Sequence, residues 1–343
     1  PERQGLLYLG TEFGLYVSAN DGASWQSMQR NLPITPITDI KVHRRDLVLS
    51  TMGRSFWILD DLTPLLQFTD ATPSRRSLLH APRPAIRWRH QGSPASSSTP
   101  EYPSAGASID YWLGSKPNAA PVLEIRSATG ALIRAFTTAG VAERTTTEQA
   151  MRAPRGRTVA GTAITDAVGE NRFTWDLLHA ASPGGRGPMV APGRYSVRLI
   201  VDGDTLRQPL VVQVDPRVRV DGITDEVLVA QEKHELAVRG AIADARQALT
   251  RARDVRTQMQ SRGAPMAREA EDIVRALETP EGRYTRPMLV SQLEYLYNMT
   301  LGADQPVPKD AAARLVTLKR ELSELVRHLD ALSRMTTASA PIP

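Results

Sequence analysis

A short segment near the amino terminus constrains the fold of this chain more than any other feature. Residues 18–25, Ser-Ala-Asn-Asp-Gly-Ala-Ser-Trp, combine side chains that bond to nearby backbone with a glycine that can take a positive φ angle. The flanking residues 6–9 and 15–17 form short runs rich in aliphatic and aromatic side chains, as strands do. The pattern therefore predicts a β-hairpin turn within a meander, with Trp25 folded back over the turn.

The strands of this meander recur about forty residues later in the chain. Residues 7–11, Leu-Tyr-Leu-Gly-Thr, are echoed by residues 47–51, Leu-Val-Leu-Ser-Thr, and residues 15–17 are echoed by residues 56–58. A period near forty is typical of propeller blades. We therefore expect a partial β-propeller of about one and a half blades.

Residues 10–18 joined to the turn resemble the BNR, or Asp-box, repeat of bacterial sortilin-like proteins, and residues 59–65 resemble the end of their last blade. In that family an immunoglobulin-like domain and then helices follow the propeller, and this order fits nearly the whole chain. Similar repeats also build sialidases, xyloglucanases, the sortilin receptor domain and photosystem II assembly factors, so the resemblance implies a fold and leaves function open. It implies a structural role for the Asp-box residues Ser18, Asn20, Asp21, Gly22, Ser24 and Trp25.

Residues 69–104 break the periodicity with six prolines and a serine-rich stretch, which is the composition of a linker. One interpretation is a solvated linker that packs against its neighbour. The other is an interaction strip that meets an acidic protein or anionic headgroups. The candidate strip consists of Arg75, Arg76, Arg83, Arg87, Trp88 and Arg89.

The middle of the chain predicts a β-sandwich. Six short strands are expected between residues 109 and 214, with a hairpin turn at Asp202-Gly203 and a long insertion loop over residues 137–168. Residues 169–176 and 191–197 resemble the immunoglobulin-like module of flagellar hook-capping proteins. We expect Trp175 and Tyr195 to be core residues rather than ligand-stacking groups.

The remainder predicts helices, over residues 225–261, 267–277, 287–301 and 308–335. The first carries an apolar seam and the last carries an unbroken leucine seam, and both must be buried. Packing of the two against each other gives a helical hairpin or bundle, and burial against another chain is the alternative. The seams are Val238, Ile242, Ala245, Leu249 and Ala252 in the first helix and Leu315, Leu318, Leu322, Leu325, Leu329 and Leu332 in the last.

The expected fold class is therefore multidomain β + α: partial β-propeller, immunoglobulin-like β-sandwich and C-terminal α-helical bundle or hairpin. The expected domains are 1–68 (blade segment), 69–104 (linker), 105–216 (sandwich), 217–336 (helices) and 337–343 (tail). Because residue 1 is a proline inside a strand-rich motif, we expect a processed product or a fragment.

Glycoside hydrolysis, which the resemblance invites, needs two carboxylates about 5 to 10 Å apart across a cleft. Asp60 and Asp61 are adjacent in a strand-like stretch, so their side chains should point to opposite faces. Fewer than two blades cannot complete the cleft of a propeller enzyme, so we predict no catalytic residue, no cofactor-binding residue and no metal ligand. The candidate carboxylates for such a pair are Glu12, Asp39, Asp46, Asp60 and Asp61.

Composition limits the classes of chemistry and binding partner that this chain can have. The chain has no cysteine, which excludes disulfides and thiolate chemistry, and its net charge of +5 comes from arginines spread among 37 acidic residues. This distribution argues against nucleic acid. No apolar run reaches the roughly 18 to 20 residues that span a bilayer, which leaves peripheral membrane association open. The resemblance implies a periplasmic or extracellular location.

We therefore predict a non-catalytic structural or interaction protein that binds other proteins, because strands at the open ends of an incomplete propeller lack partners. A concrete version is an accessory subunit on the periplasmic face of a membrane complex, such as a photosynthetic one. The alternative is the C-terminal accessory region of an exported BNR-repeat glycoside hydrolase whose active site lies upstream.

Overall fold

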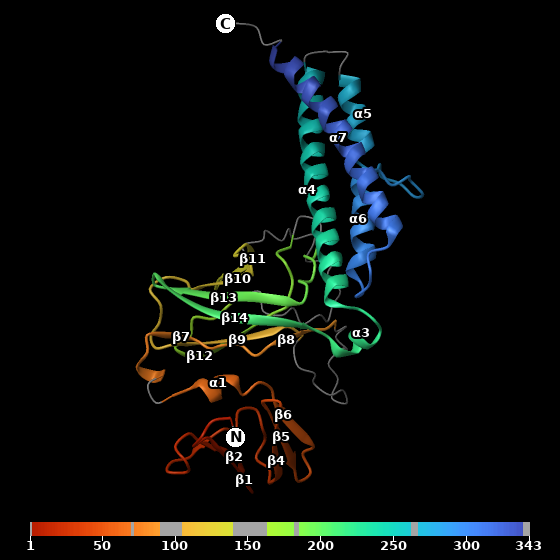
Figure 1. Ribbon diagram of the computed structural model, residues 1–343. Coiled ribbons are helices and arrows are strands. Elements are labelled where there is room, and N and C mark those ends of the chain that lie inside the picture. Colours follow the sequence, from red (N-terminus) through yellow and green to blue (C-terminus); the bar gives the residue numbers. More distant parts are fainter. Residues whose placement is uncertain are drawn as a thin grey trace. The chain divides into compact units, whose positions relative to one another are not determined.

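The computed structural model describes residues 2–69, 72–89, 105–139, 163–181, 185–261 and 267–338 (Figure 1). The fold is multidomain β + α, with several β-sheets followed by a C-terminal helical region. The chain divides into two compact units. Unit 1 comprises Pro1–Asp176 and Gly193–Gln213, and unit 2 comprises Leu177–Pro192 and Val214–Pro343.

Unit 1 begins with two three-stranded antiparallel sheets, which we call the two-sheet segment. The first has the order β1-β2-β3 and the second has the order β4-β5-β6. A short helix, α1 (Thr63–Gln67), follows β6. The strands are β1 (Leu7–Thr11), β2 (Gly14–Ser18), β3 (Gln26–Ser27), β4 (Ile37–His43), β5 (Asp46–Thr51) and β6 (Phe56–Leu59).

The two sheets pack face to face around a small apolar core. Leu15 from β2 and Leu47 and Leu49 from β5 are buried between them. Gly10 in β1 allows this approach, because a Cβ atom there would lie 2.7 Å from the Cβ of Ile37 in β4. Both predicted meanders are thus present as three-stranded antiparallel sheets, but the recurrence is offset by one strand: residues 7–11 form the edge strand β1, whereas residues 47–51 lie in the central strand β5.

The rest of unit 1 is a two-layer β-structure. One layer is a five-stranded sheet of order β11-β10-β13-β14-β8, and the other has three strands of order β12-β9-β7. The rings of Phe136 in β11 and Phe173 in β12 have centroids 4.5 Å apart, which joins the layers. The strands are β7 (Ser77–Leu79), β8 (Ala85–Arg87), β9 (Ala107–Leu113), β10 (Val122–Ser127), β11 (Leu132–Phe136), β12 (Gly169–Trp175), β13 (Gly193–Val201) and β14 (Asp204–Val214).

Two sequence predictions for this region have clear outcomes. Asp202 and Gly203 both take positive φ angles, 47° and 92°, and connect the paired residues Val201 and Asp204, so the hairpin turn is confirmed. Trp175 is fully buried and lies edge-on to Tyr195 with centroids 6.0 Å apart, as a core residue should.

The segment expected to be a linker contributes strands to both layers. A 3-10 turn (Thr72–Ser74) leads into β7, which pairs with β9, and β8 joins the edge of the five-stranded sheet beside β14. Leu79 and Ala85 are buried, and Pro82 lies between the two short strands. Prolines here separate strands rather than prevent them. Residues 90–104 of this segment lie outside the described residues, as do residues 140–162 of the expected insertion loop.

Unit 2 is a helical domain, and the bounds of its four longer helices agree with the sequence prediction to within three residues, whereas the short helix over residues 216–220 was not predicted. The leucine seam of α7 and the apolar seam of α4 share one core with α5 and α6, so the chain itself buries both seams (Figure 1). The helices are α3 (Pro216–Val220), α4 (Asp225–Ser261), α5 (Ala267–Leu277), α6 (Leu289–Leu301) and α7 (Lys309–Ala338). Among the described residues, no helix is both long and apolar enough to span a membrane.

Residues 177–192 connect β12 to β13 but belong to the helical unit. The His179 ring nitrogen Nε2 lies 2.6 Å from the Glu232 carboxylate on α4, which also accepts the Ala191 backbone N–H at 3.1 Å. Arg239 on α4 donates to the Ala180 carbonyl at 2.7 Å. Leu178 and Val190 are buried. The sequence analysis placed this connection in the sandwich domain, because nothing in its local pattern indicates a helical partner.

Candidate functional site

The turn that opened the sequence analysis is held by its own side chains. Ser18 is buried, and its hydroxyl accepts the Gly22 N–H at 2.9 Å and donates to the Asn20 side-chain oxygen at 2.9 Å. Asn20 also accepts the Ser24 N–H at 2.9 Å. These bonds replace the ladder hydrogen bonds that a turn cannot make. These side chains therefore stabilise the local conformation of the turn.

Asp21 and Trp25 complete the turn in different ways. Asp21 has a φ angle of 58°, and its backbone N–H donates to the Gly5 carbonyl at 2.9 Å. Gly22 has a φ angle of 88°, and a Cβ atom there would lie 3.7 Å from the Trp25 ring. The indole therefore lies against the turn, as predicted, and remains 39% exposed.

The outer face of each sheet in the two-sheet segment carries exposed apolar side chains, which on the second sheet stand beside the polar residues Asp39 and Lys41 of β4. In β6, Phe56 pairs with Ser50 and Ile58 pairs with Val48, so both point away from the core residue Leu49. Phe56 is 75% exposed and Ile58 is 60% exposed. We call this surface, with Val48, the β6 face.

The first sheet presents a matching surface on the opposite side of the segment. Leu7 and Leu9 in β1 alternate with the inward-facing Tyr8 and Gly10, and they are 37% and 43% exposed. Leu9 pairs with Tyr16 of β2, which is partly exposed. We call this surface the β1 face. Contiguous exposed apolar side chains of this kind mark interaction sites more often than isolated ones do.

The structure does not assemble the predicted arginine strip into one exposed surface. Arg75 and Arg76 are exposed, and Arg76 pairs with Asp202 at 3.2 Å. Arg83 binds the Asp46 carboxylate at 2.7 Å. Arg87 is only 1% exposed, and Trp88 and Arg89 are half-buried. Burial removes Arg87 from any surface of this chain, and a role for the exposed members stays a prediction.

A polar junction that the sequence analysis missed joins the two-sheet segment to the sandwich within unit 1. Arg172 on β12 donates to the Asp110 carboxylate on β9 at 2.6 Å, and also to the carbonyl oxygens of Asp60 and Asp61 at 3.1 and 3.0 Å. Arg83 reaches the Asp61 carboxylate at 3.6 Å. These partners lie far apart in sequence, so no local signal could indicate them.

Burial perturbs two carboxyls at this junction. It raises the pKa of Asp110, and the hydrogen bond from Arg172 opposes that rise. It also raises the pKa of Asp60, with Asp46 adding to the effect. Raised carboxyl pKa values occur both at catalytic sites and in structural ion-pair networks. Here the Arg172 guanidinium bonds the Asp110 carboxylate and the carbonyl oxygens of Asp60 and Asp61, so this contact ties the two-sheet segment to the sandwich.

The expectation that Asp60 and Asp61 alternate across a strand is wrong. Strand β6 ends at Leu59, and Asp61 takes a φ angle of 58°, which a strand residue does not adopt. The Asp61 side chain is buried and accepts the Thr63 N–H at 3.1 Å, at the start of α1. Glu12 and Asp39 are exposed and lie outside this junction.

Comparison with known proteins adds no identity to these sites: no protein-family model and no curated protein matches the chain. Within the part of the chain that the structure describes, no group of three His, Asp or Glu side chains could hold a metal ion. The pocket beside Leu6 and Leu62 in the two-sheet segment holds about 70 Å³, below the roughly 300 to 1,000 Å³ of ligand pockets.

Proposed function

We propose that this chain is a non-catalytic structural or interaction protein whose two-sheet segment binds apolar β-sheet surfaces of other proteins. The observation that carries the proposal is the pair of uncovered apolar faces, the β6 face and the β1 face, on opposite sides of one small core. A second sheet can pack on such a face as sandwich layers do, through the alternating apolar residues of each layer.

The packing between the two sheets of this segment shows how a β-sheet of a partner protein would bind to an outer face. The two sheets of the segment bury Leu15 against Leu47 and Leu49, so a sheet of this strand order packs on another through alternating apolar residues. Each outer face repeats that arrangement with nothing described upon it. Phe56 and Ile58, which are 75% and 60% exposed, would each contribute roughly 1 to 2 kcal/mol on full burial, and Leu7 and Leu9 less, before the costs of association.

The resemblance to BNR repeats supports the same proposal at the level of fold. If the two sheets are part of a β-propeller and the two-layer structure is immunoglobulin-like, the missing neighbours of the two-sheet segment are further blades. We propose accordingly that the partners are proteins of a larger, membrane-associated complex on the periplasmic or extracellular side, with no nucleic acid. An accessory subunit of such a complex would use its sheets for assembly.

A photocrosslinking experiment in the producing cell tests this proposal. A benzoylphenylalanine replaces Phe56, Ile58 or Leu9, and Val316, which is 71% exposed on α7, serves as the matched control position. We expect crosslinks from the three sheet positions to one defined protein at peptides with alternating apolar residues, and none from position 316.

The crosslinked peptide also separates the proposal from its alternative. Peptides from a different polypeptide support an interaction protein. Peptides from further blades of the same polypeptide favour the accessory region of a longer BNR-repeat hydrolase. Free reaction of all three positions with solvent in the cell, without any crosslink, contradicts both.

A further inference from the structure

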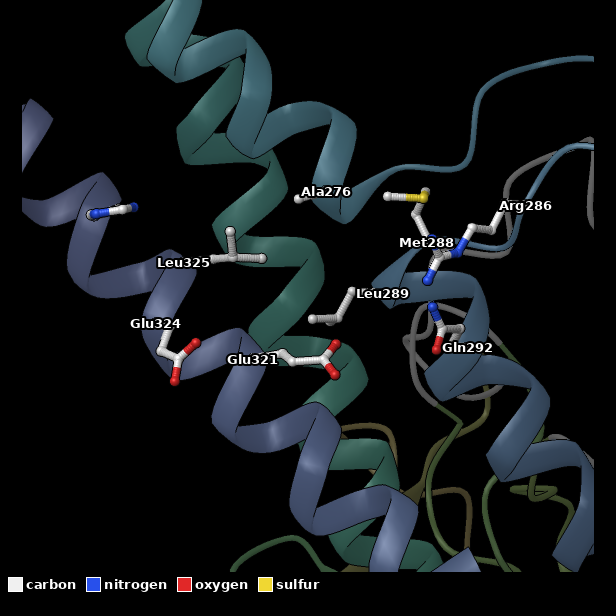
Figure 2. Close-up of a pocket in the computed structure, with 9 residues that line it drawn as sticks. Ala276, Arg286, Met288, Leu289, Gln292, Glu321, Glu324 and Leu325 are labelled. Atoms are coloured by element: carbon white, nitrogen blue, oxygen red, sulfur yellow. The ribbon is translucent and has the colours of Figure 1, made fainter.

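The helical unit contains a pocket of about 390 Å³ that lies outside the surfaces described above (Figure 2). It is lined by the end of α5, the start of α6 with the residues before it, and the middle of α7. Its volume falls within the roughly 300 to 1,000 Å³ of small-molecule sites, which often lie between the helices of bundles.

The floor of this pocket is apolar. Leu289 on α6 is buried and belongs to the helical core, and Leu325 on α7 packs against that core while remaining partly exposed. Both side chains project into the space between α6 and α7 in Figure 2. The floor can therefore accept an aliphatic group.

The walls of the pocket carry charges of opposite sign on different elements. Glu321 and Glu324 project from α7, whereas Arg286 comes from the segment before α6, next to Gln292 (Figure 2). Within the described residues, Arg286 and Glu324 form no hydrogen bond or ion pair, and Glu321 has only a 3.6 Å contact with Arg314. Arg286 and Glu324 are therefore not used by the described part of the fold and remain available to a ligand, whereas Glu321 shares its carboxylate with Arg314, which also donates to the side chain of Gln292.

We propose that this pocket binds a small zwitterion with an apolar body, of the class of apolar amino acids and dipeptides. The ammonium group lies at the Glu321 and Glu324 carboxylates, the aliphatic side chains cover Leu289 and Leu325, and the carboxylate is bound by the Arg286 guanidinium. A purely anionic ligand would meet two carboxylates, and a purely cationic one would meet Arg286. Only a ligand with both charges satisfies both walls. This inference does not depend on the proposed function.

The dipeptide L-leucyl-L-leucine is the probe for the first test, followed by methyl NMR of the intact chain. We expect saturable shifts of the Leu289 and Leu325 methyl groups. N-acetyl-leucyl-leucine, which lacks the ammonium, and leucyl-leucinamide, which lacks the carboxylate, should each bind about tenfold more weakly, as loss of one charged hydrogen bond predicts.

Matched variants assign each charge to its wall. Glu324→Gln should weaken binding of the dipeptide by about tenfold but leave binding of the acetylated dipeptide unchanged. Arg286→Gln should likewise weaken binding of the dipeptide by about tenfold but leave binding of leucyl-leucinamide unchanged. Glu269→Gln on α5 and Arg320→Gln on α7 remove exposed charges outside the pocket and should change nothing. Far-UV circular dichroism verifies that each variant is folded.

Three outcomes would overturn the inference. The first is the absence of methyl shifts at these leucines up to about 10 mM dipeptide, an affinity too weak to matter. The second is equal binding of the dipeptide and its two blocked forms. The third is an equal effect of the pocket variants and the control variants.

Discussion

The helical unit and the two-sheet segment differ in how far they bury their apolar residues. In the helical unit, the apolar stripes of α4, α5, α6 and α7 meet in one core, and exposed side chains such as Val229 and Val316 lie on different helices. In the two-sheet segment, one face of each sheet is buried and the other is open. An amphipathic helix needs one neighbour to bury its single apolar face, whereas a sheet that is apolar on both faces needs a neighbour on each. Among the described residues, the helices cover one another, whereas the outer faces of these sheets keep exposed apolar side chains.

The largest expected effect tests whether the helical unit depends on its own core. Leu318 on α7 is fully buried there, and Leu318→Ala should lower the free energy of unfolding of this unit by about 2 to 5 kcal/mol, from lost burial and the cavity left behind. Hydrogen exchange with mass spectrometry during urea titration reports the loss in α4 to α7 separately from unit 1.

Val316→Ala is the matched control for this substitution. Val316 lies on the same helix but is 71% exposed, so its truncation should change stability by no more than about 0.5 kcal/mol. Equal effects of the two variants would show that the leucine seam does not hold the unit together.

The next effect concerns the two-sheet segment, whose small core we expect to rely on the sandwich beside it. Arg172→Gln leaves the buried Asp110 carboxylate without its cation and removes the bonds to the carbonyls of Asp60 and Asp61. Because the Arg172 side chain is 37% exposed, solvent moderates the loss to about 1 to 2 kcal/mol. Hydrogen exchange should accelerate in β4 to β6, while the helical unit is unchanged.

Arg194→Gln provides the control for the junction, since Arg194 is exposed on β13. Equal exchange rates in β4 to β6 for both variants would mean that the two-sheet segment is stable without the junction, and the contrast between the two regions would then lie only in their uncovered faces.

A smaller effect should appear in the helical unit alone as pH falls. His234 on α4 is buried, its Nε2 atom has no hydrogen-bond partner among the described residues, and burial lowers its pKa. The folded state therefore binds this proton more weakly than the unfolded chain does. The free energy of unfolding of the helical unit is therefore at its full value above the ordinary histidine pKa of about 6.5. It falls progressively below that pH, because the unfolded chain then binds a proton that folded His234 does not.

His234→Leu should accordingly reduce the loss of urea resistance of the helical unit between about pH 7.5 and about pH 5. His43→Leu, at an exposed position of β4, should leave that loss as it is in the parent chain. Parallel pH profiles for the parent chain and His234→Leu would assign the pH dependence to a group other than His234.

The sequence predicted those parts of the fold that local patterns specify. The bounds of α4 and α5 were predicted from the sequence, α4 from its apolar periodicity, and the Asp202-Gly203 turn follows from two residues that accept positive φ. The predicted linker was instead found to contain β7 and β8, because pairing with a distant strand outweighed its proline content.

The candidate surfaces were predictable only in part. An open β-surface was expected from the number of strands, but its residues, Phe56 and Ile58, could be assigned only once the register with β5 was known. The polar junction was not predictable, because Arg172 lies 62 residues from Asp110 and 111 residues from Asp61. Arg83 was grouped with an exposed strip, although the structure pairs it with Asp46.

The last prediction is that a change on the β6 face leaves stability almost unchanged, and it tests the contrast between the helical core and the open sheets most directly. The double variant Phe56→Thr with Ile58→Thr changes two exposed side chains of β6 to a residue that strands accept, so the free energy of unfolding should stay within about 0.5 kcal/mol. Leu49→Thr, at a buried position of the neighbouring strand, should instead cost about 2 to 4 kcal/mol, because it opens a cavity and buries a hydroxyl. Hydrogen exchange of β4 to β6 during urea titration measures both. A large loss of stability in the double variant would mean that the β6 face is covered within this chain after all, and the contrast between a closed helical core and open sheets would fail.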